Sequence, residues 1–196
     1  MLRPVSKSPR RCPFPSTHGL AYLHARGVVH GEISTSAVLI RRGRRELSGA
    51  VSDPRYKRLL RGADAPPLRP LWAPPEVLRG EPALPTSDVF SMCTAIHHTT
   101  TGRLEWYKKD SEEHCLVPSQ LAWRVVSGDR PNEAEVLREL RSGDVSAEGL
   151  LAVLRRGWNE HVEARPKSSE CEAIPRAILF PLTLLRMRSQ VNSLKR

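Results

Sequence analysis

The sequence predicts a mainly α-helical domain with one small β-hairpin near its start. Residues 88–101 are apolar around most of a helix circumference, which is typical of a helix buried on all sides. Residues 146–158 carry apolar side chains at helical spacing, so a second helix should pack against the core. Two short extended segments, 37–40 and 48–52, flank an Arg-rich turn that contains Gly43, and together they predict the hairpin.

Length and composition fit one domain with its own core. The chain has 196 residues, of which 39% are hydrophobic and 27% charged. The 17 prolines indicate long irregular connections between the helices. We expect no transmembrane segment, because the best apolar stretch, Ala177–Leu185, is far shorter than the ~20 residues needed and contains Pro181.

The four cysteines are widely separated and include no C-x-x-C pair. We therefore expect no metal site, and free thiols of this kind suit a reducing compartment, the cytoplasm or alternatively the nucleus. The net charge of +10 comes from scattered Lys and Arg clusters rather than from a nucleic-acid motif. A solvated basic surface is our first interpretation, and a nucleic-acid-associated protein remains an alternative.

The order of expected elements follows from the local signals. Residues 18–27 read as the last turns of a helix that stops at Gly27, and residues 28–30 as a short extended segment. Eight prolines in 53–85 predict a long loop. We expect Ser87 to cap the buried helix at its start and Gly102 to end it. Three more helices are expected at 118–127, 132–141 and 146–158.

Residues 18–40 read HGLAYLHARGVVHGEISTSAVLI. This segment resembles the catalytic-loop region of a protein kinase, whose pattern is H-R-D-L-x-x-x-N. Four further segments resemble motifs of the same family and follow in its order: Leu71–Leu78 is similar to the A-P-E motif, Ser87–Met92 to the buried central helix, Thr101–Trp106 to the segment that ends that helix, and Gly157–Pro166 to the late W…RP signature. The residues 121–131 and those around Trp158 look most like tyrosine-kinase-like kinases.

The resemblance covers residues 18 to about 175 and implies the helical C-lobe of a kinase. No G-x-G-x-x-G occurs in the chain, and 17 residues before the first match are too few for the small ATP-binding lobe. We therefore expect a tail at 1–17, a kinase-like C-lobe at 18–178 and a basic extension at 179–196. A small lobe should be missing from this chain.

Several catalytic positions of the family hold other residues here. Glu32 stands where the resemblance implies the base Asp, and its carboxyl lies one methylene further out. Gly31 replaces the motif's Arg, and Ser34 stands at the position of a Lys that steadies the transferred phosphoryl group. Ala37 replaces the magnesium-binding Asn, and a methyl group cannot ligate a hard cation.

Asp53 is the counterpart of the metal-binding Asp of the family's D-F-G motif, which makes it a candidate, weak metal ligand. Pro54 and Arg55 follow it instead of Phe and Gly, so an ordinary Asp-Pro turn is the alternative interpretation. From Pro54 to Pro75 only Tyr56 carries a hydroxyl, so no phospho-threonine switch is expected.

Structural positions of the family are better kept. The resemblance implies that Glu76 and Arg165 form a buried ion pair, with two solvated surface charges as the alternative. It also implies that Asp88 accepts backbone N–H groups of the loop 30–32, although Asp88 could instead serve its own helix terminus alone. His30 is expected to pack beneath the Asp53 region as a structural residue.

These observations predict a pseudokinase-like C-lobe that transfers no phosphate, needs no ATP or magnesium and acts by binding other proteins. A docking surface is expected on the helix at 121–126, where Trp123 is either exposed or part of the core. The alternative is a truncated form of a divergent kinase that uses ATP and Mg²⁺ to phosphorylate protein Ser, Thr or Tyr. The second alternative is the basic nucleic-acid-associated protein.

Overall fold

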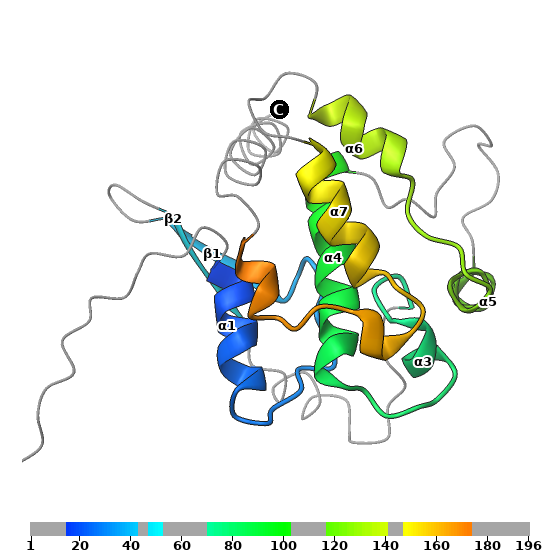
Figure 1. The fold of residues 1–196 in the computed structure, drawn as a ribbon, viewed down its shortest axis with the longest axis horizontal. Helices are drawn as coiled ribbons and strands as arrows, with labels where there is room; N and C mark the ends of the chain where they lie inside the picture. Colours follow the sequence, from blue (N-terminus) through cyan, green and yellow to red (C-terminus); the bar gives the residue numbers. More distant parts are fainter. Residues whose placement is uncertain (1–14, 43–46, 53–69, 103–116, 141–146, 174–196) are drawn as a thin grey trace, which may run out of the picture.

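A computed structural model describes residues 15–42, 47–52, 70–102, 117–140 and 147–173. Figure 1 shows helices gathered around one central helix, with a two-stranded sheet at one side. The elements follow in this order: α1 (Pro15–His24), β1 (Val38–Arg42), β2 (Leu47–Val51), α3 (Pro75–Leu78), α4 (Pro85–Thr101), α5 (Pro118–Val126), α6 (Glu133–Glu139), α7 (Ala147–Gly157) and two 3₁₀ turns, η1 (Val162–Ala164) and η2 (Glu170–Ala173). The predicted mainly α-helical class with one small β-hairpin is confirmed.

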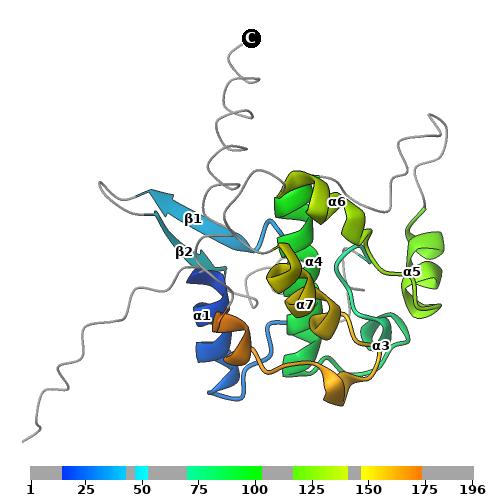
Figure 2. The same cartoon turned by 45° about the horizontal axis from the view of Figure 1, so that its top comes forward.

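Helix α4 forms the centre of the domain. Thirteen of its seventeen residues are buried, as the apolar pattern of residues 88–101 predicts. Figure 2 shows α1, α6 and α7 arranged around α4, so elements far apart in the sequence cover its different sides. The helix ends at Gly102, whose φ of 66° is left-handed and is readily adopted by glycine. The stop predicted at Gly102 is confirmed.

The start of α4 corrects one expectation. Ser87 was predicted to cap the helix, but the helix begins two residues earlier, at Pro85. Proline suits the first turn, because it has no N–H to leave unpaired and its φ is already helical. Ser87 therefore lies inside the first turn, where its Oγ accepts the Leu84 N–H at 3.0 Å.

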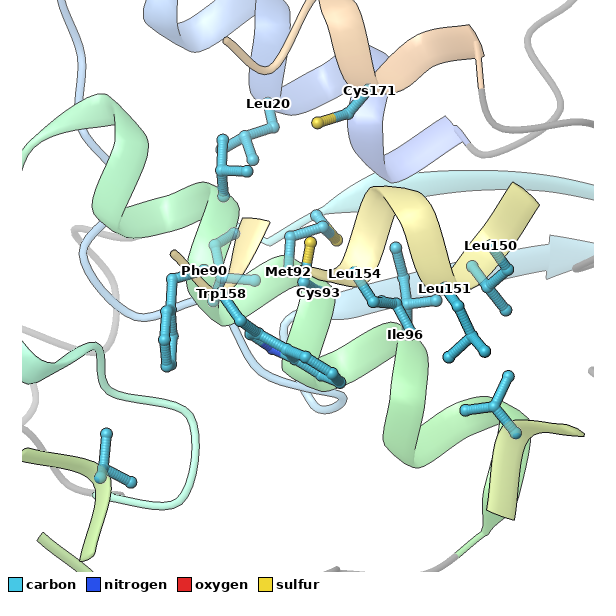
Figure 3. Close-up of a cluster of buried hydrophobic side chains, with 14 of the residues drawn as sticks. Leu20, Phe90, Met92, Cys93, Ile96, Leu150, Leu151, Leu154, Trp158 and Cys171 are labelled. Atoms are coloured by element: carbon cyan, nitrogen blue, oxygen red, sulfur yellow. The ribbon is translucent and has the colours of Figure 1, made fainter. Parts of the chain in front are cut away.

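The hydrophobic core lies between α4, α7, α1 and η2. Figure 3 shows side chains of these elements pointing toward one another, with Cys93 and Ile96 of α4 facing Leu151 and Leu154 of α7. Leu150, Leu151 and Leu154 have no exposed surface, which confirms the apolar stripe predicted for residues 146–158. The backbone at the end of α7 also lies close to α4.

The β-hairpin is antiparallel, with Val38 opposite Val51 and Leu39 opposite Ala50. It lies beside α1 (Figure 1), where Gly19 approaches Val51. A Cβ on Gly19 would lie 3.4 Å from the Val51 Cγ2, an ordinary contact. Residues 28–30 were expected to be extended, but they form no strand because no neighbouring strand pairs with them within the described part of the chain.

Helices α5, α6 and α7 keep their predicted order with shorter bounds, whereas the short helix α3 lies within the segment 53–85 that was expected to be a long loop. Asn132 is the cap of α6 rather than its first residue, and its Oδ1 accepts the Ala134 N–H at 3.0 Å. Helix α1 stops at His24, and Gly27 follows in a turn with φ of 69°. The segments assigned as tail and basic extension fall mostly outside the described residues, and α1 begins at Pro15.

Within the described residues, no helix has the length and apolar composition needed to cross a membrane.

Candidate functional site

The loop between α1 and β1 is held by Asp88, from the first turn of α4. The backbone N–H groups of His30 and Gly31 donate to Asp88 Oδ2 and Oδ1, each at 2.7 Å. Asp88 is only 1% exposed, so these bonds lie away from bulk water. The geometry expected for Asp88 from the family resemblance is therefore present in the structure, and it fixes the backbone at the two residues before Glu32.

His24, the last residue of α1, contacts the same carboxylate. Its Nε2 lies 2.9 Å from Asp88 Oδ2, and its Nδ1 lies 2.8 Å from Ser168 Oγ. Because a carboxylate oxygen accepts, Nε2 carries the proton in this contact. His24 and Ser168 were not among the candidate site residues predicted from the sequence. One signal was available for His24, since it follows the buried Leu20 by four residues and so lies on the same helix face.

His30 joins the loop to the end of β2. The Glu32 N–H donates to His30 Nδ1 at 3.2 Å, so Nδ1 is unprotonated and the proton is on Nε2. Nε2 then donates to the Ser52 carbonyl oxygen at 3.0 Å. Ser52 directly precedes Asp53, so the ring of His30 supports the chain where the resemblance implies a metal ligand. Asp53 itself lies outside the described residues.

The position expected for a magnesium-binding Asn is a buried alanine. Ala37 has no exposed surface. Its carbonyl oxygen accepts the Ser52 N–H at 2.8 Å, and its own N–H donates to the Ser34 carbonyl oxygen at 3.0 Å. The backbone around Ala37 is therefore built into the hairpin, while the side chain offers only a methyl group. A magnesium ion finds no ligand at this position.

Ser34 is also buried, at 5% exposure, and its Oγ lies 2.9 Å from Ser36 Oγ. A hydroxyl on a single carbon cannot place positive charge on a phosphoryl group as the Lys implied by the resemblance would. Glu32 is half-buried and supplies one carboxylate in the loop. Within the described part of the chain, no group of three or more His, Cys, Asp or Glu side chains could hold a metal ion. These residues do not fit the magnesium site of an active kinase.

Glu76 and Arg165 form a buried bidentate ion pair. Arg165 Nη1 lies 2.6 Å from Glu76 Oε1 and Nη2 lies 2.8 Å from Oε2, and neither side chain is more than 1% exposed. Ser87 Oγ also donates to Glu76 Oε1, at 2.6 Å. Burial acts to raise the pKa of Glu76, but the hydrogen bonds from Arg165 and Ser87 outweigh it and hold the pKa below its usual value.

This ion pair links three elements of the domain. Glu76 lies in α3, Ser87 in α4 and Arg165 directly after η1. Arg165 Nε also donates to the Asn159 carbonyl oxygen at 2.7 Å, and its guanidinium carbon lies 5.1 Å from the centre of the Phe90 ring. The interpretation of Glu76 and Arg165 as solvated surface charges is therefore wrong.

Helix α5 presents a different kind of surface. Leu121 and Val125 are buried, whereas Trp123 is 70% exposed and Val117, directly before the helix, is 51% exposed. A shallow hollow beside Trp123 is lined by Ser119, Gln120 and Arg124. Trp123 is therefore exposed and is not part of the core.

Comparison with known protein families shows to which family the chain belongs. The profile of the protein tyrosine and serine/threonine kinase family matches residues 14–174. This chain belongs to that family. The resemblance drawn from the five sequence motifs is thus confirmed at the level of the protein kinase family.

Individual relatives match parts of this kinase-family chain. Human dual specificity testis-specific protein kinase 1 is 38% identical over 84 residues, which cover 37% of this chain and 13% of that protein. Mitogen-activated protein kinase kinase kinase 17 of Arabidopsis thaliana is 30% identical over 127 residues, 62% of this chain and 32% of that protein. Retinal guanylyl cyclase 1 of Rattus norvegicus is 30% identical over 158 residues, 76% of this chain and 13% of that protein. The chain thus spans a third or less of each of these relatives.

Proposed function

We propose that this chain is a catalytically impaired protein-kinase-like domain that acts by binding other proteins. The observation that carries the proposal is Ala37, a buried methyl group inside a loop whose backbone support is intact. Asp88 still holds the amides of His30 and Gly31, so the loop has the order of a kinase catalytic loop. Phosphoryl transfer depends on positioned metal ions and charges, and an ordered loop without them supplies little of that stabilisation.

The substitutions around Ala37 support the same conclusion. Ser34 hydrogen-bonds to Ser36 instead of presenting a cation toward a phosphoryl group. Glu32 keeps a carboxylate, but its extra methylene moves the acceptor oxygens relative to an Asp on the same backbone. We therefore propose that the domain does not use ATP or magnesium ions as cofactors.

The exposed face of α5 supports a role in protein binding. Trp123 buries little of its ring within the described chain, and Trp residues are enriched where interfaces carry most of their binding energy. The hollow formed by Ser119, Gln120 and Arg124 adds polar groups at the edge of this ring. We propose another protein as the partner of this surface. Cys93 and Cys171 are buried free cysteines, and free thiols persist in reducing compartments, so we also propose a cytoplasmic location.

Nucleotide binding tests the catalytic part of the proposal. We expect calorimetric titration of the full chain with Mg–ATP to show no saturable binding in the micromolar range, and no transfer of phosphate to generic protein substrates. Ala37→Asn, which restores an oxygen ligand, serves as the comparison variant. Saturable micromolar binding by the unchanged chain, with phosphotransfer that is lost in Glu32→Ala, would instead favour a divergent active kinase.

Cross-linking tests the binding part. The full chain and Trp123→Ala are each cross-linked in extract, and the cross-linked peptides are mapped by mass spectrometry. We expect a reproducible protein partner joined at α5, which is lost in Trp123→Ala and retained in Leu137→Ala, a change at an apolar residue of α6 that is 38% exposed. Melting curves of both variants show whether the fold is kept. Equal cross-linking by the two variants would contradict a binding role for α5.

A further inference from the structure

Three side chains from distant parts of the sequence form one continuous hydrogen-bonded chain. Ser168 Oγ lies 2.8 Å from His24 Nδ1, and His24 Nε2 lies 2.9 Å from Asp88 Oδ2. Asp88 then accepts the amides of His30 and Gly31. This series of hydrogen bonds therefore runs from the segment before η2, through α1 and α4, into the loop between α1 and β1.

The residue types resemble a hydrolytic Ser-His-Asp set, but the geometry excludes that use. In such a set the nucleophile must meet a substrate, whereas Ser168 is only 5% exposed. Ser168 is one of the residues around a small apolar cavity, together with residues that include Cys93 and Cys171. The arrangement can position groups but cannot reach a reacting molecule.

The protonation pattern assigns each group one role. Asp88 already accepts two backbone amides and the His24 Nε2–H, so it uses three of its roughly four acceptor sites. When Nε2 carries the only ring proton of His24, the Nδ1 atom is an acceptor that needs a donor. Ser168 Oγ is the donor in contact, and its O–H is the only proton it has to give.

We propose that Ser168 is a positioning residue that locks the ring of His24 against Asp88 and thereby holds the amides of His30 and Gly31 in place. Without the hydroxyl, Nδ1 is a buried acceptor with no donor in this contact. The ring then turns or moves to find one, and Asp88 Oδ2 loses the Nε2–H that fixes its orientation. The conformation of the loop thus depends on a residue more than 130 positions away in the sequence. This inference holds whether or not the loop meets a nucleotide.

Two pairs of variants separate the hydroxyl from packing. Ser168→Thr and Ser168→Val have nearly the same shape, so any packing cost of the added methyl group is common to both variants. They differ in the hydroxyl alone. Ser168→Ala is compared with Ser169→Ala, since Ser169 is the neighbouring residue and is exposed.

Amide hydrogen exchange and ring ¹⁵N shifts of the full chain, measured by NMR, test the proposal. We expect the His30 and Gly31 amides to exchange about threefold to tenfold faster in Ser168→Ala and Ser168→Val, the factor that one hydrogen bond produces, and at the original rate in Ser168→Thr and Ser169→Ala. The His24 ring shifts should report the Nε2–H tautomer in the original chain and a mixture in the two variants without the hydroxyl.

Two results would overturn the proposal. One is equal loop exchange and equal His24 shifts in Ser168→Thr and Ser168→Val. The other is an equal acceleration of amide exchange at Val136 in α6, a fully buried residue remote from these hydrogen bonds. Uniform acceleration of exchange reports only a loss of global stability. If Ser168→Ala does not fold, the Thr and Val pair still decides the question.

Discussion

Arg165 and Glu76, which lie 89 positions apart in the sequence, form a bidentate ion pair with nitrogen–oxygen distances of 2.6 and 2.8 Å. The pair joins the residue after η1 to α3 and, through Ser87, to α4. Removing one partner of such a pair leaves the other charge buried and unpaired. The stability of the domain should therefore be sensitive to the loss of either partner.

We expect Arg165→Ala to destabilise the domain by about 3–5 kcal/mol, because Glu76 then keeps an uncompensated buried carboxylate. Arg156→Ala is the control. Arg156 also contacts a carboxylate, Glu170 at 3.4 Å, but its side chain is 62% exposed, so its loss should change stability by less than about 1 kcal/mol. Urea unfolding of both variants measures the difference, and equal midpoints would show that the buried pair does not contribute.

The lowered pKa of Glu76 predicts a loss of stability in acid. Its pKa in the folded chain lies below the usual value of 4.5, so the unfolded chain takes up the proton first as pH falls. The contribution of Glu76 is thus complete above about pH 4.5 and disappears as pH falls through the folded pKa. We expect Glu76→Gln to be less stable at pH 7 and to lose less stability between pH 5 and pH 3. An unchanged acid slope in urea unfolding would contradict this assignment.

Asp88→Asn should destabilise the domain clearly. An amide presents one oxygen and one NH₂ group, so either the Gly31 N–H or the pair of donors from His24 and His30 faces another donor. Each buried donor left unsatisfied costs about 1–3 kcal/mol.

Glu32→Gln is the matched change in the same loop. Its side chain is half-buried and keeps its size and shape, so we expect little loss of stability. The comparison is made by thermal unfolding, and a larger loss in Glu32→Gln than in Asp88→Asn would mean that Asp88 does not anchor the loop.

Gly157 is required by the packing of α7 on α4. A Cβ at Gly157 would clash with Cys93 Sγ and would lie 3.3 Å from Cys93 Cβ, so the Cys93 side chain or one of the two helices must shift. We expect Gly157→Ala to cost about 1–3 kcal/mol, despite the better helix propensity of alanine. Cys93→Ala removes the sulfur atom, so the double variant should lose less than the sum of the two single changes. Additive losses in urea unfolding would show that the two residues do not share this space.

The sequence alone determined the class of fold and the family. Apolar spacing is local information, so the buried α4 and the apolar stripe of α7 could be predicted from periodicity. The Glu76–Arg165 pair and the Asp88 contact came from the family resemblance rather than from spacing. Local signals did not fix the ends of the elements, as Ser87 shows, because a proline two residues earlier fits the first turn equally well.

The tertiary structure decided which polar groups meet. Nothing local to Ser168 or His24 shows that their side chains lie 2.8 Å apart, since 144 residues separate them and only the packing of α1 and η2 against α4 brings them together. The sequence also did not determine whether Trp123 is exposed, because one turn of α5 carries both the buried Leu121 and the exposed ring of Trp123. Periodicity reports the apolar face of a helix, whereas hydrogen-bond partners and surface exposure depend on which elements cover it.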